Sequence, residues 1–353
     1  MIASRPVTQS GKLLAAYSDL CSNTGPIHAR VATDLGARLQ SGAWFPAYQV
    51  ATPPCLRAFI SMDAPNVPYL EDPRELPVDE RSKPWQLMCV SVDKWHALED
   101  MQRLRIGRVL AKLGFWQFVA DLIEPGDEPC DTLETLSLSH LRAVARHQLD
   151  ERDTNAVALL AETRIAMATN EQLPIAARLA SAVYLTVHYV RKQRDNARAR
   201  RWQTYATSLR SSVRSDSLPW VLNSVYWRAV SYIPYLEGNH RLVSEMLDQA
   251  EECAIKALDQ AAEDSRLAAL ENMGPLFETR GRAAWDVGDL ATAETYYRRL
   301  VDHDPWDAKG HVRLADFLRD TGQSAQARES YSQAAELGAP YTIYAQTQAD
   351  QCT

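Results

Sequence analysis

Apolar residues recur every three to four positions through the middle of the chain, and this is the period of an amphipathic α-helix. The pattern predicts four long helices here, at Leu138–Leu149, Asn155–Ala168, Ile175–Val190 and Ala197–Val213. Residues 127–237 contain no glycine, and long helices form where helix breakers are rare. The turns between the helices fall near Arg152 and Arg194. We therefore expect an all-α protein built from helical hairpins.

The first part of the chain has a different pattern. Ten of the eighteen prolines lie in residues 1–84. Residues 13–40 have the apolar spacing of two amphipathic helices, interrupted at Gly25, whereas residues 43–48 and 55–60 fit either short strands or buried loops. We predict an irregular N-terminal segment at residues 1–99, helical with proline-rich loops, followed by a helical repeat domain at residues 100–353.

Two stretches near the end of the chain, 274–307 and 308–341, have the same length and carry the same residues at matching places. The shared positions, each 34 residues apart, are Gly288 and Gly322, Ala293 and Ala327, and Tyr297 and Tyr331. Gly281 is matched by the equally small Ala315, and small residues there let two helices approach closely. The two later glycines suit the left-handed conformation that ends a helix. This period predicts a helix–turn–helix repeat.

These residues resemble the tetratricopeptide repeat (TPR). The resemblance implies a right-handed solenoid of helical hairpins, a curved rod whose inner surface holds a ligand. Earlier turns placed at Gly114, Arg152, Arg194 and Gly238 give four further pairs of looser and longer type. We therefore expect about six helix pairs, of which the last two carry the motif.

The family resemblance also implies that the first helix of each pair lines the concave groove. The ligand-binding positions that this register gives are Arg142, Arg146, Tyr184, His188, Arg191, Arg228, Tyr232, Tyr235, Arg282 and Trp285. Arginine can bind a carboxylate or phosphate through two parallel hydrogen bonds, and the aromatic rings can hold apolar side chains. Because the whole chain has a net charge of −7, a basic groove would select acidic ligands. We expect an acidic peptide segment or a free C-terminal carboxylate.

Structural alternatives exist for most of these positions. The two arginines at 142 and 146 can simply solvate a helix face, and His188 can be a partly buried helix residue. The tyrosines at 232 and 235 share one helix face and can pack in the core, and Trp285 can pack between repeats. The basic run 191–201 holds six cations and can bind a nucleic-acid backbone, but a solvated turn is the interpretation we favour.

The predicted function is that of an adaptor or regulator that binds a peptide or protein segment without catalysis. The alternative is an enzyme, or an enzyme subunit, in which residues 1–99 contribute a site and the repeats present a peptide substrate. A binding module would have an open trough, whereas an enzyme would have a closed pocket where residues 28–96 meet the repeats. The sequence identifies neither the partner nor the oligomeric state.

Other classes of protein are not indicated. No apolar run is long enough to span a membrane, and no signal-peptide segment follows the N-terminus, so we expect a cytoplasmic protein without a membrane partner. The six cysteines form no CxxC pair, and no phosphate-binding loop, zinc-protease or dinucleotide motif occurs. We expect no cofactor, no metal and no catalytic residue.

Overall fold

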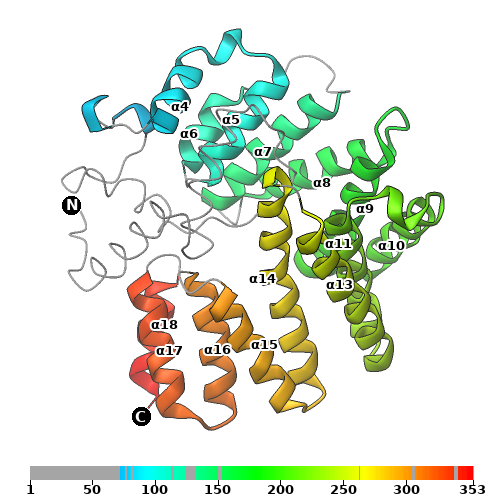
Figure 1. Cartoon of the computed structure of the whole chain (residues 1–353), viewed down its shortest axis with the longest axis vertical. Helices are drawn as coiled ribbons and strands as arrows, with labels where there is room; N and C mark the ends of the chain where they lie inside the picture. The colour runs from blue at the N-terminus through cyan, green and yellow to red at the C-terminus, as the bar shows by residue number, and fades with distance from the viewer. Residues whose placement is uncertain are drawn as a thin grey trace. The chain divides into compact units, whose positions relative to one another are not determined.

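The structure of the chain is a computed structural model. It describes residues 72–75, 78–80, 83–112, 115–124, 132–149, 153–261, 263–303, 307–337 and 341–352. Across these residues the chain is helical and contains no strand (Figure 1). The all-α prediction is therefore confirmed for the described residues. The elements expected at 13–40, 43–48 and 55–60 lie outside them.

The helices follow one another with short connections. In chain order they are α4 (Lys83–Asp93), α5 (Asp100–Lys112), α6 (Trp116–Leu122), α7 (Leu133–Leu149), α8 (Thr154–Thr169), α9 (Ile175–His188), α10 (Asn196–Ser211), α11 (Trp220–Val230), α12 (Tyr232–Leu236), α13 (His240–Asp259), α14 (Glu263–Asp286), α15 (Leu290–His303), α16 (Ala308–Asp320), α17 (Ser324–Leu337) and α18 (Thr342–Gln351). Single 3₁₀ turns occur at η2 (Pro73–Glu75), η3 (Val78–Glu80), η4 (Trp95–Ala97) and η6 (Ser215–Ser217). A π-helical turn, η5 (Tyr189–Gln193), continues α9.

The four helices predicted in the middle of the chain are confirmed as α7, α8, α9 and α10. Two of them start at an aspartate whose carboxylate accepts hydrogen bonds from the backbone. Asp153 accepts from the N–H groups of Asn155 and Ala156, and Asp195 accepts from the N–H of Arg198. The first N–H groups of a helix have no acceptor within the helix, so these caps set where each helix begins.

The turns predicted from glycine have the expected backbone. Positive φ angles of 71°, 79° and 82° occur at Gly238, Gly288 and Gly322. The turn at Arg194, which has no glycine, adopts the same region with a φ of 53°. A left-handed conformation costs a residue with a side chain about 1 kcal/mol. The turns expected at Gly114 and Arg152 lie outside the described residues.

The close approach predicted at Gly281 is also present. A Cβ atom added to this glycine would lie 3.0 Å from the ring of Tyr297 on the next helix, α15. This distance is shorter than ordinary carbon–carbon contact, so α14 and α15 can pack this closely only because position 281 has no side chain.

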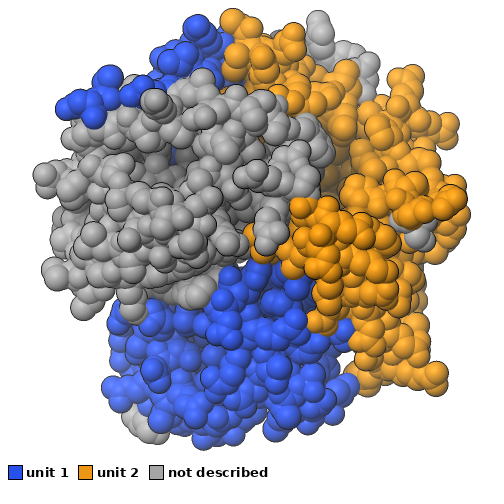
Figure 2. All heavy atoms as spheres, in the orientation of Figure 1, with its two compact units in different colours: residues 1–96, 109–115, 273–353 blue, residues 97–108, 116–272 orange. Residues whose placement is uncertain are grey.

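The chain forms two compact units (Figure 2). Unit 1 comprises residues 1–96, 109–115 and 273–353, and unit 2 comprises residues 97–108 and 116–272. The division falls inside α14. The predicted boundary at residue 99 stays a prediction, because most of the N-terminal segment lies outside the described residues.

Each unit has its own core of consecutive helices. In unit 2, α7 packs on α8, α8 on α9 and α9 on α10, and α11 packs on both α9 and α13. Its core is rich in fully buried small and branched side chains, including Leu179, Ala182, Leu185, Ala199 and Ala206. In unit 1, α15 packs on α16, α16 on α17 and α17 on α18 around Phe317 and Tyr331. Consecutive helices thus pack as neighbours within each unit.

Candidate functional site

Tyr184 of α9 lies at the centre of a group of basic and aromatic side chains in unit 2. His140 of α7 contacts its ring edge-on, with centroids 5.3 Å apart, and His188 stacks on it at 5.9 Å. The guanidinium carbon of Arg164, on α8, lies 4.9 Å from the centre of the same ring. Three helices therefore bring one arginine and two histidines to a single tyrosine. We call these four residues, together with Arg108 of α5, the basic–aromatic cluster.

The hydrogen bonds of the cluster determine the tautomer of His140. The hydroxyl of Thr163 donates to the carbonyl of Leu159 at 2.8 Å, so its oxygen accepts from Nδ1 of His140 at 3.1 Å. The other ring nitrogen, Nε2, then accepts from Nε of Arg164 at 3.2 Å. Burial, with the charges of Arg164, Arg108 and His188, lowers the pKa of His140 well below its ordinary value. A neutral imidazole thus holds the guanidinium of Arg164 in place.

Arg164 is a buried cation that contacts no carboxylate among the described residues. Its side chain is only 7 % exposed, and its other hydrogen bond is a weak one of 3.8 Å to the sulfur of Met167. Burial lowers its pKa to about 10. Burial and the charge of Arg164 lower the pKa of Arg108 to about 9. Both pKa values are above 7, so both arginines carry a positive charge at neutral pH. The charge of Arg164 disfavours the charged form of Arg108.

His188 adds an unsatisfied polar atom to the cluster. The residue is 5 % exposed, and its buried Nε2 has no hydrogen-bond partner among the described residues. Burial, followed by the charges of Lys192 and His147, lowers its pKa. The π-helical turn η5 begins at the next residue, and such turns occur frequently at functional sites. A buried nitrogen without a partner is rare and calls for an explanation.

The remaining predicted positions of unit 2 have different surroundings. Nε of Arg142 donates to the carbonyl of Ala120 at 3.4 Å, and Arg146 forms an ion pair of 2.8 Å with Asp153. The rest are Arg191, which is exposed, Arg228, whose buried Nε has no partner among the described residues, Tyr232, which is buried, and Tyr235, which is half-buried. Of the predicted residues, the structure brings Tyr184 and His188 together.

The two predicted positions in unit 1 lie in another setting. The ring of Trp285 contacts Phe317 at 5.5 Å and Tyr297 at 6.2 Å, both edge-on, so it packs between successive helices. Arg282 lies near Glu278 and contributes to lowering the pKa of that carboxyl group. The packing contact of Trp285 is the alternative that the sequence left open for this residue.

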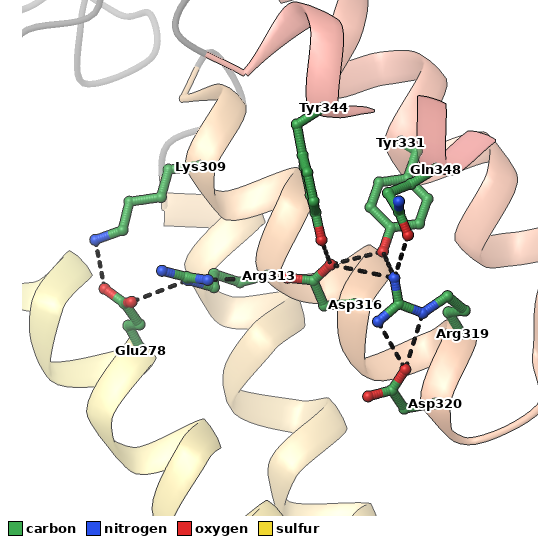
Figure 3. A network of polar contacts seen from close by, with 9 residues as sticks. All are labelled: Glu278, Lys309, Arg313, Asp316, Arg319, Asp320, Tyr331, Tyr344 and Gln348. Carbon is green, nitrogen blue, oxygen red and sulfur yellow. Dashed lines mark hydrogen bonds and ion pairs between the residues drawn. The ribbon is translucent and has the colours of Figure 1, made fainter. Parts of the chain in front are cut away.

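The polar side chains of unit 1 pair with one another (Figure 3). Glu278 accepts from Nζ of Lys309 at 2.5 Å and from Nε of Arg313 at 3.0 Å. Further along α16, Asp316 accepts from the hydroxyls of Tyr331 and Tyr344, and Arg319 pairs with Asp320. We call these eight residues, with Gln348, the C-terminal network. It contains carboxylates for its cations, unlike the basic–aromatic cluster.

Sequence reasoning missed two members of the basic–aromatic cluster, Arg164 and His140, whereas Arg108 falls at a groove position of the first helix pair in the register that the family resemblance implies. Arg164 lies on the second helix of its pair, among the buried residues Leu160, Met167 and Ala168. An arginine at such a position is unusual, because charged residues are rarely buried unless they are paired. This mismatch between residue type and apolar face is the signal that would have identified it.

No family model matches the chain, and no curated protein matches it significantly. Among the described residues, no three histidine, cysteine or acidic side chains are grouped to hold a metal ion. In the same part of the chain, no helix is both long and apolar enough to cross a membrane.

Proposed function

We propose that this chain is a helical-repeat protein of the tetratricopeptide type that binds an acidic or carboxylate-bearing peptide segment and catalyses no reaction. The 34-residue repeat, the left-handed glycines that end its first helices and the close approach at Gly281 all support a stack of hairpins. On this proposal the hairpins form a right-handed solenoid, and the first helix of each pair faces the ligand.

The basic–aromatic cluster is the observation that carries the proposed binding function. It places one buried guanidinium and two histidines around a tyrosine in a chain whose net charge is −7. Local positive charge on an acidic molecule attracts anionic ligands and repels cationic ones. An acidic peptide is therefore a better match for this region than a basic or neutral one.

The contacts of the basic run 191–201 favour a solvated turn over a nucleic-acid site. Arg198 pairs with Asp195 at 3.3 Å and Arg200 pairs with Glu237, so carboxylates already neutralise part of its charge. The guanidinium of Arg198 also lies 5.6 Å from the ring centre of Tyr189. These contacts leave fewer cations for a phosphate backbone.

Binding of a set of 12-residue peptides of graded charge, measured by fluorescence anisotropy, tests the proposal. The protein should bind acidic members of the set, and the affinity should fall as salt increases. Changing Arg142, Arg191 and Arg228 to Glu should weaken this binding by at least tenfold. The matched control changes Arg201, Arg241 and Arg328 to Glu, which alters the net charge equally on second helices. An equal loss in both variants, or no binding of any peptide, would reject a recognition groove.

A further inference from the structure

We propose that the basic–aromatic cluster is a specific oxyanion site, in which Arg164 and His188 bind one carboxylate or phosphate group beside Tyr184. This inference rests on the proposed function for its biological role, and it deepens it by naming the ligand group and the residues that hold it. The carboxylate and the phosphate share the chemistry that these side chains recognise, namely negative oxygens that accept hydrogen bonds.

The charge of Arg164 has no balancing anion among the described residues. Transferring a guanidinium into a protein interior is unfavourable unless an anion accompanies it. The contacts of Arg164 are neutral: a histidine nitrogen, a methionine sulfur and the face of a tyrosine ring. These contacts orient the group but supply no negative charge. An oxyanion would supply it.

Contacts within the cluster hold its basic groups in fixed orientations. His140 fixes Nε of Arg164, so the guanidinium plane is set before any ligand arrives. The ring of Tyr184 is in contact with both this guanidinium and the imidazole of His188. A site whose donors are already oriented binds with a smaller loss of conformational entropy. The packing thus pre-organises basic groups from two helices around one tyrosine.

His188 contributes an unsatisfied polar atom to the cluster. Its buried Nε2 lacks a partner among the described residues, and an oxyanion would accept a hydrogen bond from it. His188 is not needed to hold Arg164, which His140 already contacts. One ligand would therefore satisfy two separate deficits of the cluster, the charge of Arg164 and the free nitrogen of His188.

Unit 1 contains a buried charge that neighbouring side chains of opposite charge neutralise. Glu278 in unit 1 is 7 % exposed, as is Arg164, but two cations contact it directly. Among the described residues, direct counter-charges thus contact Glu278 but not Arg164. This contrast favours a ligand-binding role for the cluster over a purely structural one.

The test uses the full chain and two simple probes, sodium phosphate and sodium acetate, each compared with sodium chloride at equal ionic strength. The melting temperature should rise by about 3 °C for every tenfold increase in a probe that binds, once the site is mostly filled. A rise with phosphate alone identifies a phosphate site, and a rise with both probes identifies a general oxyanion site. No rise with either probe, relative to chloride, would overturn the inference.

Variants then locate the effect. Arg164→Gln keeps a donor for His140 but removes the charge, and it should abolish the rise. Arg201→Gln, an exposed arginine on α10 in the same unit, should retain it. A full rise in the Arg164→Gln protein would place the anion elsewhere and reject the site. If that variant does not fold, the nitrogen-15 resonance of His188 Nε2 in the wild type provides the answer, because it must shift on addition of the probe that raises the melting temperature.

The two proposals can fail separately. Peptide binding that is equal in wild type and Arg164→Gln, without any phosphate or acetate effect, would leave the proposed function intact and remove the oxyanion site. An Arg164-dependent rise with phosphate or acetate, without binding of any peptide, would leave the oxyanion site intact and remove the peptide-binding function.

Discussion

The two units of this chain differ in whether a buried charge is contacted by groups of opposite charge. In the C-terminal network of unit 1, Glu278 is enclosed by Lys309 and Arg313, and each charge has a partner. In the basic–aromatic cluster of unit 2, Arg164 meets only neutral groups among the described residues. Paired buried charges help to define a packed structure, whereas an unpaired one costs stability and persists at sites with a function. On our proposal, the paired charges of unit 1 serve stability and the unpaired charge of unit 2 serves binding.

The largest expected change in the free energy of unfolding concerns Glu278, the buried charge that has partners. Glu278→Gln leaves Lys309 and Arg313 without their shared carboxylate in a partly buried position. We expect a loss of about 2 to 3 kcal/mol in the free energy of unfolding, less than for a fully buried pair because both cations are about one third exposed. Urea denaturation measures this loss.

The control is Glu294→Gln, which breaks an exposed ion pair with Arg298 on one face of α15. Exposed pairs at this spacing contribute about 0.5 kcal/mol or less. Equal losses in the two variants would show that burial does not strengthen the Glu278 interactions, and the contrast between the units would fail.

The same carboxyl group predicts a pH dependence of nearly equal size. Although burial raises the pKa of Glu278, Lys309 and Arg313 outweigh it and lower the value from 4.5 to about 2. The unfolded chain therefore binds the proton more readily than the folded one between these values, so stability rises with pH across this interval. The stabilisation by Glu278 should be complete above about pH 5 and should disappear as the pH falls towards 2.

The difference in unfolding free energy between wild type and Glu278→Gln isolates this contribution, because other carboxyl groups titrate in both proteins. The difference should shrink steadily from pH 5 to pH 2.5. A difference that stays constant over this range would contradict the lowered pKa.

A smaller effect tests the packing that makes unit 1 rigid. Gly281→Ala places a methyl group 3.0 Å from the buried ring of Tyr297, so this ring or the two helices must shift by a few tenths of an ångström. We expect a loss of about 1 to 2 kcal/mol in the free energy of unfolding, despite the better helix propensity of alanine. Gly310→Ala is the matched control, because its nearest neighbour would lie at 3.6 Å. That control should instead gain about 0.5 kcal/mol, and a gain at both positions would show that the close approach is not required.

Much of this fold could be predicted from the sequence, because it depends on local signals. The periodicity that predicted α7 to α10 and the glycines that predicted the left-handed turns act over a few residues. The TPR assignment and the handedness of the stack remain predictions. In the site, Tyr184 and His188 were predicted to lie in one region, and the structure brings them into contact.

The rest depends on contacts between residues far apart in the chain, and local patterns do not carry that information. The helix register did not reveal that the groove candidate Arg146 pairs with Asp153 at the start of the next helix. It also did not reveal that the ring of Trp285, another candidate, contacts Phe317. Arg164 was overlooked because helix register alone does not reveal that an arginine on a second helix reaches the ring of Tyr184. Which cation is buried and which is neutralised is decided by tertiary packing.

For Arg164, the buried charge without a charged partner among the described residues, we expect a change of opposite sign in the free energy of unfolding. Arg164→Gln removes a buried charge while leaving a donor for Nε2 of His140. We expect the ligand-free protein to be unchanged or more stable by up to about 1 kcal/mol, in contrast to the loss for Glu278→Gln. Urea denaturation in chloride buffer, without phosphate or acetate, measures it. A loss of 2 kcal/mol or more would mean that Arg164 is a structural residue, and the two units would then no longer differ in kind.

The smallest effect concerns the turns, where the two units also differ. Unit 1 uses Gly288 and Gly322 in the left-handed region, whereas unit 2 uses Arg194 at the end of the π-helical turn beside the cluster. Arg194→Gly should relieve the strain of the side chain, but the more flexible unfolded chain offsets part of the gain, so we expect a net stabilisation of about 0.5 kcal/mol. The urea midpoint should rise while the slope of the transition stays unchanged, since no surface is newly exposed. The reverse change, Gly322→Ala, should cost about 1 kcal/mol as the matched control. A loss of stability in Arg194→Gly would show that the arginine side chain itself holds the turn, and the strain beside the cluster would then be compensated locally.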